Sequence, residues 1–316
     1  MSPSSPTVSV IMPCYNQGQY VEDAVESVLA QTYQPIEIIL INDGSTDEHT
    51  IQLLQTYQKP HLSIIHTSNR GPSAARNTGI QQARGQYILP LDADDRIAPT
   101  FLEKTVPILE SDPNIGIVYS QAELFGEQSG RFDLPTYNFP EILLGNMIFN
   151  TSLYRKADWE KVGGYHENMV WGWEDYDFWL SLIELGRGVV QIPEVLYFHR
   201  EVPNSRSQQM TQDYWVKSYT QIFKNHPALY TNHIEALFQH LVMVRADAQS
   251  AHHRLHQAEL QIQKTELQLQ QAEARMFAIA SIVKNSWFWR VKHHWNQFRK
   301  RLGLKVETLD PLITVE

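Results

Sequence analysis

Cysteine is almost absent from this chain of 316 residues, in which Cys14 is the single example. A lone cysteine excludes an intramolecular disulfide and is typical of a reducing compartment. Long apolar runs are missing as well: nowhere do about 18 apolar residues follow one another, so we expect no transmembrane helix. The N-terminal segment lacks the basic residues of a secretory signal peptide. From these absences we expect a cytoplasmic protein.

Basic residues are outnumbered by acidic ones, 26 to 35, which gives a net charge of -9. This balance offers no broad cationic surface for phosphate backbones, so we expect no nucleic-acid partner. The hydrophobic content of 42% is ordinary for a globular protein. The length suffices for one large domain with an appendage, or for two domains.

The first part of the chain alternates short apolar runs with amphipathic stretches. Near-continuous Ile, Val and Leu runs separated by helical patterns predict a mostly parallel sheet that helices cover on both faces. The expected strands are residues 8–13, 36–41, 62–66, 86–91 and 115–120, and the clearest expected helices are residues 20–31 and 73–84. The predicted fold class is therefore α/β.

Three unusual loops follow these expected strands: PCYNQG after the first, NDGSTD after the second and DADD after the fourth. Ligands of open parallel sheets bind at the carboxyl ends of the strands. We therefore expect the three loops to converge on a functional site.

The DADD loop holds Asp92, Asp94 and Asp95 together, although their negative charges repel one another. One interpretation is a helix start at Pro99, which nearby acids would stabilise. A calcium-binding EF-hand loop fits poorly, because Ile97 occupies the position that requires glycine. A phosphoryl-transfer site is a third interpretation. The functional interpretations share a divalent cation, which relieves the repulsion when it binds a diphosphate.

Neither a Walker motif nor a glycine-rich dinucleotide motif follows the first expected strand. The chain contains, in this order, the segments VSVIMPCYNQGQYVEDAVESVLAQTY, IEIILINDGSTD, NRGPSAARNTGIQQARGQYILPLDADD and WGWEDYDFWLSL. In order and spacing they resemble family-two glycosyltransferases, and the resemblance covers residues 7–210. It implies a GT-A fold, an inverting transfer from a nucleotide sugar to a glycan or lipid-linked acceptor, and a role in making cell-envelope polysaccharide.

The resemblance implies a donor site in the first two loops. Tyr15 corresponds to the residue that lies against the nucleotide base, and Pro13 and Asn16 would shape that pocket. Asp43 corresponds to the carboxylate that accepts the uracil N–H, which implies a UDP-sugar as donor. The alternative for Asp43 is an aspartate that only stabilises a turn.

The resemblance also implies how the diphosphate is held. Arg76 corresponds to the basic residue near the pyrophosphate, although an exposed helical arginine needs no such role. Asp92 matches the carboxylate that faces the ribose, and Asp94 the one that coordinates Mn²⁺ or Mg²⁺ on the diphosphate. Asp95 is the usual third acid, and support of the loop is sufficient to explain it.

An inverting transfer needs a carboxylate base for the acceptor hydroxyl, while the metal ion neutralises the leaving diphosphate. The WEDYD segment offers Glu174, Asp175 and Asp177. Adjacent helical residues point about 100° apart, so Glu174 and Asp175 cannot share one role. Apolar neighbours at helical spacing and the family pattern both favour Asp175; the alternative is that these acids only stabilise a helix that starts near residue 174. Trp171 and Trp173 fit either stacking on an acceptor sugar or core packing.

The sequence departs from the family pattern after the expected strand VVQIPEVLYFHR. Many relatives carry Arg-x-His-x-x-Ser there, with a histidine that approaches the metal or the pyrophosphate. Val202 stands where that histidine would be. His199, three residues earlier, is either a substitute metal ligand or a structural strand residue.

Residues 231–283 are rich in Gln, Ala, Glu and His. Two heptad series predict a long helix or coiled coil and suggest a homo-oligomer formed through it. They are Ile234, Leu241, Ala248, Leu255, Ile262, Leu269 and Met276, and Leu237, Val244, Ala251, Ala258, Thr265, Ala272 and Ile279. Small residues weaken the second series, so packing on the protein's own domain is the alternative. We predict a GT-A domain over 1–230, this helix over 231–283 and a tail over 284–316.

The tail contains a basic aromatic helix in the segment SWFWRVKHHWNQFRKRLGLK. Its expected apolar face consists of Trp287, Val291, Trp295, Phe298 and Leu302, with cations at Arg290, Lys292, Arg299, Lys300 and Arg301. A cationic helix with tryptophan on its apolar side suits an anionic membrane surface, which predicts peripheral attachment on the cytoplasmic face. The alternative is that this face docks on the enzyme or on a partner helix.

Two other functions compete with a hexosyltransferase-like enzyme. One is a nucleotidyltransferase of related architecture, which would release pyrophosphate, but its usual glycine-rich basic loop is absent. The other is a coiled-coil scaffold with an inactive transferase domain, and the intact DADD and WED segments argue against it.

Overall fold

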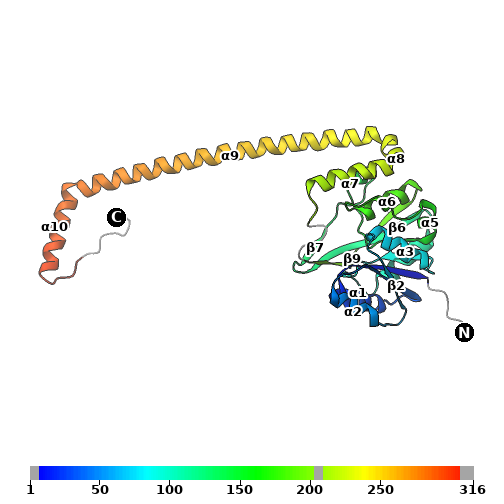
Figure 1. The fold of residues 1–316 in the computed structure, drawn as a ribbon. Coiled ribbons are helices and arrows are strands. Elements are labelled where there is room, and N and C mark those ends of the chain that lie inside the picture. Colours follow the sequence, from blue (N-terminus) through cyan, green and yellow to red (C-terminus); the bar gives the residue numbers. More distant parts are fainter. Residues whose placement is uncertain (1–6, 203–208, 307–316) are drawn as a thin grey trace. The chain divides into compact units, whose positions relative to one another are not determined.

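The computed structural model describes residues 7–202 and 209–306, drawn as a ribbon in Figure 1. The chain divides into two units, with the boundary between His240 and Leu241. Every strand of the described chain lies in the first unit, and the described part of the second unit is helical.

The first half of the sheet is parallel. In chain order its elements are β1 Val8–Cys14, α1 Gly18–Leu29, β2 Ile36–Asp43, α2 Glu48–Thr56, β3 Leu62–Thr67, α3 Pro72–Gln82 and β4 Tyr87–Pro90. The strand order is β3-β2-β1-β4. Because right-handed crossovers reverse direction after β3, α1 and α2 lie on one face and α3 on the other (Figure 1). Helices on both faces explain why β1 and β2 are apolar and almost entirely buried.

The remaining strands extend the sheet beyond β4. They are β5 Arg96–Ile97, β6 Ile115–Gly126, β7 Gly130–Phe132, β8 Leu153–Arg155 and β9 Gly188–Glu201. The order continues β4-β8-β6-β9-β5, with β7 paired to β6. The antiparallel pairs are only two or three residue pairs long, whereas β6 pairs with β9 in parallel along its whole length. The predicted α/β fold with a mostly parallel sheet is confirmed. The five strands predicted for the first part of the chain are present, and the expected strand VVQIPEVLYFHR lies within β9.

Further helices complete the first unit. They are α4 Phe101–Ser111, the 3₁₀ turn η1 Glu141–Leu144, α5 Lys156–Val162, α6 Glu174–Glu184, α7 Gln212–Asn225 and α8 Pro227–Asn232. The helix α6 begins at the residue predicted from the WED segment, and every residue from Tyr176 to Ile183 is buried. A helix buried on all sides has little freedom to move, so α6 fixes the acids at its start.

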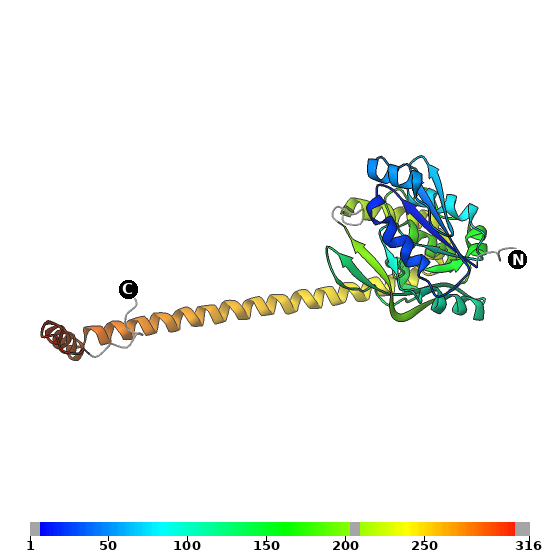
Figure 2. The same cartoon turned by 90° about the horizontal axis from the view of Figure 1, so that it is seen from below.

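A long helix, α9 Ile234–Asn285, begins in the first unit, where Leu237 is buried, and continues into the second. Figure 2 shows it as one continuous helix, which confirms the predicted long helix. A second helix, α10 Trp287–Arg301, follows Ser286, whose hydroxyl accepts a hydrogen bond from the Trp289 amide at 3.3 Å. Within the described ranges, no helix combines the length and apolar composition needed to cross a bilayer.

Candidate active site

A cavity of about 660 Å³ lies where β1, β2 and β4 end. Its walls include Tyr15, Asp43, Arg76, Asp92 and Glu174, which come from segments far apart in the sequence. The carboxyl ends of parallel strands meet at one edge of a sheet. The predicted convergence of the three loops is therefore correct.

The end of β1 gives this cavity an aromatic side. Tyr15 is 44% exposed and lines the cavity together with Pro13. Asn16 adopts φ 56° and turns to the loop after β2, where its side-chain oxygen accepts hydrogen bonds from the amides of Thr46 and Asp47 at 2.7 and 2.9 Å. Asn16 thus acts on the shape of the site by holding a neighbouring loop.

Asp43, the last residue of β2, is buried in the cavity wall. Its two carboxylate oxygens accept hydrogen bonds from the backbone amides of Arg70 and Gly71, each at 2.9 Å. Gly71 has φ 87°, a conformation that favours glycine, and this turn presents its amide to the carboxylate. A carboxylate oxygen has two acceptor positions, so Asp43 can hold the loop and also receive an N–H from a ligand.

Arg76 on α3 is buried between two acids. It is 3% exposed, and its Nη1 and Nη2 donate hydrogen bonds to Glu174 and Asp92, both at 2.8 Å. A buried guanidinium needs such compensation for its charge. Arg76 therefore joins α3, the DADD loop and the start of α6 in one wall, unlike the exposed helical arginine that the sequence also allowed.

The acids of the DADD loop have different surroundings. Asp95 is fully buried and accepts hydrogen bonds from the Tyr197 hydroxyl and from the Arg200 amide, the latter at 2.8 Å, so it anchors β9. Burial, followed by the charges of Asp95 and Asp92, raises the pKa of Asp94 to about 7. Ionised Asp94 is thus costly until a cation approaches. Carboxylate oxygens are the ligands that Mg²⁺ and Mn²⁺ prefer.

His199 on β9 faces the same acids. Its Nδ1 lies 3.2 Å from a carboxylate oxygen of Asp95 and 3.2 Å from the Tyr197 hydroxyl. Burial lowers the pKa of His199, but the hydrogen bond and charge of Asp95, together with the charge of Asp94, raise it to about 9. His199 is therefore an imidazolium at neutral pH and offsets part of the negative charge. Val202, where many relatives carry histidine, lines the cavity.

A second cavity, of about 170 Å³, adjoins the start of α6. Its lining includes Asp175, Trp173 and Asn150, and it shares Arg76, Asp92 and Glu174 with the larger cavity. The Asp175 carboxylate accepts a long hydrogen bond of 3.4 Å from Asn146. Burial, followed by the charge of Glu174, raises the pKa of Asp175 to about 6. A carboxylate with this pKa is suited to take up a proton near neutral pH.

Aromatic side chains gather beside the smaller cavity. Trp173, in its wall, packs against Tyr219 and Trp215 of α7 with ring centroids 4.7 and 6.2 Å away. Trp171 lies 5.2 Å from Tyr214. Trp215 is 51% exposed and Trp171 is 38% exposed. In this aromatic cluster Trp173 has mainly packing contacts, whereas Trp171 and Trp215 present ring surface to solvent.

Two features of the site were not predicted from the sequence. The aromatic face of α7 left a readable signal, because Trp215 and Tyr219 are four residues apart and so lie on one side of a helix. The pairing of Arg76 with Glu174 left no signal in the sequence, since the two residues are 98 positions apart.

Comparison with known proteins assigns this site to a family. The family model described as glycosyl transferase family 2 matches residues 9–173, more than half of the chain. The chain belongs to glycosyl transferase family 2. The match contains the DADD loop and ends immediately before Glu174.

Similar proteins of this family cover parts of the chain. An uncharacterised glycosyltransferase of Escherichia coli, YibD, is 32% identical over 167 residues, which are 52% of this chain and 45% of YibD. The chain spans 45%, 62% and 27% of the first three curated relatives that it matches.

Two solved structures have the same fold. TarS of S. aureus, crystallised with UDP-GlcNAc, gives a TM-score of 0.58 at 19% identity, over 69% of this chain and 66% of that one. A mannosyltransferase of Pyrobaculum calidifontis, solved with GDP-Man and Mn²⁺, gives a TM-score of 0.52 at 20% identity, over 72% of this chain and 70% of that one. With the family match, these likenesses establish a GT-A glycosyltransferase domain.

Proposed function

We propose that this chain is an inverting glycosyltransferase that moves a sugar from a UDP-sugar to a hydroxyl of a glycan or lipid-linked acceptor. The observation that carries the proposal is the shared wall of the two cavities, which Arg76, Asp92 and Glu174 form together. A donor in the larger cavity would meet an acceptor from the smaller one at this wall. Direct displacement needs adjoining sites, because the attacking and leaving oxygens lie on opposite sides of the sugar carbon.

The larger cavity would hold the nucleoside diphosphate. Tyr15 offers its ring to the base, and Asp43 keeps an acceptor position for the uracil N–H, which supports a UDP-sugar. Arg76 neutralises Asp92 and Glu174, so that these acids repel the donor less. TarS, which shares the fold, was crystallised with UDP-GlcNAc and with UDP.

The residues of the DADD loop fit a Mn²⁺ or Mg²⁺ ion held by Asp94. Clustered carboxylates are hard oxygen ligands, and their mutual repulsion is relieved when a cation binds. Such an ion, when bound, neutralises the charge on the leaving diphosphate. Asp92 would face the ribose from the same loop, while Asp95 remains engaged with β9.

Asp175 would act as the base. Its carboxylate takes the proton of the acceptor hydroxyl while that oxygen bonds to the anomeric carbon of the donor sugar. The bond from this carbon to the diphosphate oxygen breaks, and the nucleoside diphosphate leaves with the electron pair. Attack from the opposite side inverts the anomeric configuration.

The aromatic cluster supports a sugar as acceptor. Exposed tryptophan rings such as those of Trp171 and Trp215 can stack on the apolar face of a pyranose ring. Of the alternatives, the family match disfavours a nucleotidyltransferase, and the paired acids of both cavities disfavour an inactive scaffold.

For the C-terminal part we propose the division expected from the sequence, with a transferase domain over 1–230, a helix over 231–283 and a tail over 284–316. Heptad side chains of α9 such as Leu255, Ile262 and Leu269 are exposed in the single chain, which supports a homo-oligomer. The exposed apolar face of α10 and its basic last turn support attachment to an anionic membrane.

Metal-dependent release of UDP tests the proposed function. The full-length protein and Asp94→Asn would be incubated with a panel of nucleotide sugars and Mn²⁺, without acceptor. We expect slow hydrolysis of at least one UDP-sugar, abolished by EDTA and nearly so by Asp94→Asn, and calorimetry should show weaker UDP binding when Mn²⁺ is withdrawn. Undiminished UDP binding without metal would contradict the role of Asp94, and hydrolysis confined to other nucleotide sugars would contradict the donor.

A further inference from the structure

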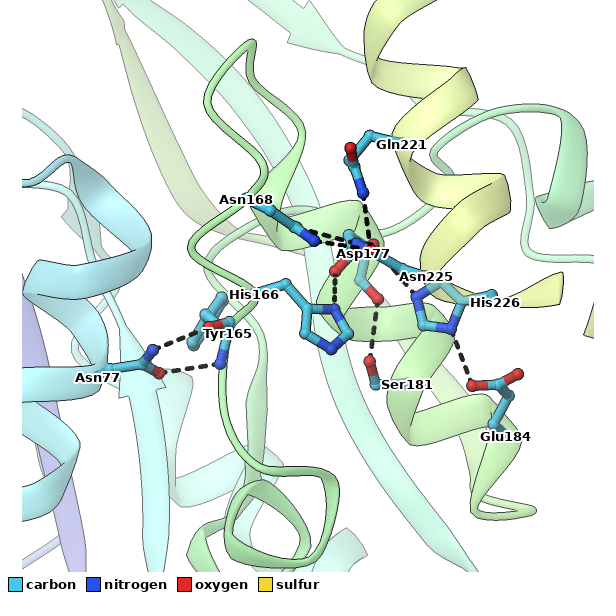
Figure 3. Close-up of polar contacts among 10 residues, drawn as sticks. All are labelled: Asn77, Tyr165, His166, Asn168, Asp177, Ser181, Glu184, Gln221, Asn225 and His226. Atoms are coloured by element: carbon cyan, nitrogen blue, oxygen red, sulfur yellow. Dashed lines mark hydrogen bonds and ion pairs between the residues drawn. The ribbon is translucent and has the colours of Figure 1, made fainter.

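A second cluster of potential ligands joins three segments of the first unit (Figure 3). It consists of His166 from the loop before α6, Asp177 on α6, and His226 at the junction of α7 and α8. One nitrogen or oxygen atom of each lies within 4.8 Å of the others. None of the three has a part in the proposed sugar transfer.

His226 is buried in a way that favours a cation beside it. It is 1% exposed, and its Nδ1 lies 2.8 Å from a carboxylate oxygen of Glu184, to which it donates a hydrogen bond (Figure 3). Its Nε2 lies 3.2 Å from Asp177 Oδ1, but it has no partner with hydrogen-bond geometry among the described residues. When the ring is neutral with its proton on Nδ1, the Nε2 lone pair meets a buried carboxylate. A cation shared by the two atoms would satisfy both. Burial lowers the pKa of His226, but the hydrogen bonds and charges of Asp177 and Glu184 raise it overall, so a proton on Nε2 competes with a cation at this position.

The side chains around His226 and Asp177 resemble the outer shell of a metal site. Asp177 is fully buried, its Oδ2 lies 2.7 Å from His166 Nδ1, and its Oδ1 accepts a hydrogen bond of 2.7 Å from Asn225. Histidines that bind metals usually donate their second ring N–H to a carboxylate or carbonyl, which orients the ring. Glu184 provides that group for His226.

We propose that His166, Asp177 and His226 bind one Zn²⁺ ion or a similar late first-row cation. Two imidazole nitrogens and one carboxylate oxygen form a common zinc ligand set, with bonds of about 2.0–2.2 Å and a fourth position for water. Tetrahedral bonds of that length place ligand atoms about 3.3 Å apart. The three atoms here lie within 4.8 Å of one another, so the side chains must draw closer together when the ion binds. His166 lies on a loop and is partly exposed, so it can adjust; when its Nδ1 binds the ion, the neutral ring carries its proton on Nε2 instead.

An ion at this position would fasten the α7–α8 junction to α6. Because α6 carries Asp175 and α7 carries Trp215 and Tyr219, the bound ion would fix the aromatic cluster relative to the proposed base. That positioning role rests on the proposed function, whereas metal binding by the cluster does not.

The test is a Zn²⁺ titration of chelator-treated, full-length protein without nucleotide, followed by calorimetry and by Tm. Co²⁺ would be used in parallel, because its visible absorption reports tetrahedral coordination. We expect one tight equivalent that raises Tm. His166→Gln, at a partly exposed position, should abolish the tight equivalent and the rise in Tm. Glu184→Gln keeps all three ligands and should weaken binding by about 10–100-fold.

Two control variants separate this cluster from other sites. The double variant His252→Gln, His256→Gln removes an exposed histidine pair one turn apart on α9, and Asp94→Asn removes the proposed donor-metal ligand. Both should keep the tight equivalent. Tight binding that survives both His166→Gln and His226→Gln would overturn the proposal. So would a wild-type protein without a tight equivalent, the result expected if a proton on His226 Nε2 joins it to Asp177.

Discussion

Glu174 and Asp175 are adjacent carboxylates with different partners. Glu174 is bound to the buried Arg76 at 2.8 Å, whereas Asp175 lines the smaller cavity and has a pKa of about 6, raised first by burial. Burial lets Asp175 take up a proton near neutral pH, whereas the Glu174 carboxylate is occupied by its ion pair with Arg76. This contrast supports Asp175 as the base and gives Glu174 the role of holding Arg76.

Asp175→Asn should lower the transfer rate by about 10²–10⁴-fold and leave UDP affinity almost unchanged, because a general base acts on the barrier and not on donor binding. Glu174→Gln is the matched control. It removes one countercharge of a buried guanidinium, so we expect weaker UDP binding or lower stability. Initial rates and UDP calorimetry distinguish the two variants. Wild-type rates in Asp175→Asn, with the loss in Glu174→Gln, would move the base by one residue.

At the scale of residues, the sequence predicts where the acids of the site lie better than it predicts their hydrogen-bond partners. Asp43 and Asp92 follow directly from strand ends that meet at one edge, and both line the larger cavity. Asp94, two residues after Asp92, is buried and is not among the residues that line this cavity. The sequence alone could not show that Asn16 holds the loop after β2, because Asn16 and Thr46 are 30 positions apart. Nor could it show that Asp95 anchors β9, because Asp95 and Arg200 are 105 positions apart.

Among the secondary-structure elements, one buried acid ties together β1, β2 and the loop that follows α3. Glu37 accepts hydrogen bonds from the Ser9 hydroxyl at 2.6 Å and from the Arg84 amide at 2.7 Å, and its second oxygen accepts two from the Arg84 guanidinium. Burial raises the pKa of Glu37, but these hydrogen bonds outweigh it and the net pKa is lowered. The ionised form therefore stabilises the folded sheet.

Glu37→Gln should lower the free energy of unfolding at pH 7 by about 1.5–3 kcal/mol, the range for hydrogen bonds to a charged group. Since the folded pKa lies below the unfolded value of about 4.3, the stabilisation is complete above that value and is lost as pH falls through the folded pKa. Urea unfolding at neutral and acidic pH measures this. The difference between wild type and variant should shrink in acid; a difference independent of pH would rule out the ionised network as its source.

The elements were predictable where their pattern is local. Continuous apolar runs identified β1, β2, β4 and β6, because strands that are largely buried on both faces are rich in apolar residues. The same signal identified β3 at the edge of the sheet, although its residues are only partly buried or exposed. The strand β9 extends one residue beyond each end of the expected strand VVQIPEVLYFHR. Buried, partly exposed and exposed residues are mixed in it, and its pairing with β6 contains register shifts. Its structure depends on that distant partner.

At the scale of the whole molecule, the heptad seam of α9 is the clearest surface for another copy of the chain. Leu255→Lys with Ile262→Lys puts two charges on the seam and should reduce self-association, because a buried lysine has no countercharge there. Gln257→Lys with Gln263→Lys adds the same charge off the seam and should leave association unchanged. Sedimentation equilibrium over a range of concentrations tests this. A wild-type chain that stays monomeric throughout would contradict an oligomer formed through α9.

The exposed surface of α10, in the C-terminal tail, suits attachment of the molecule to a membrane. In α10, Trp287 and Trp295 are exposed on one face, and Arg299, Lys300 and Arg301 form the last turn. Apolar burial and cations near anionic lipid, about 1 kcal/mol each, would act together. Binding to vesicles should therefore need anionic lipid and weaken with salt, because screening acts within about 10 Å at 0.1 M.

Removing residues 284–316 should abolish vesicle binding and spare transfer to a water-soluble acceptor, since every residue proposed for the site, Trp215 of α7 included, precedes residue 284. Two variants divide the effect. Trp287→Ala with Trp295→Ala keeps the charge and should weaken binding at any salt concentration, whereas glutamine at Arg299, Lys300 and Arg301 should remove the dependence on anionic lipid. Equal binding of the wild type to neutral and anionic vesicles would eliminate the electrostatic part. A truncated protein that unfolds or loses activity would instead mean that the apolar face of α10 packs against the enzyme, and the membrane assignment would then be wrong while the transferase assignment stands.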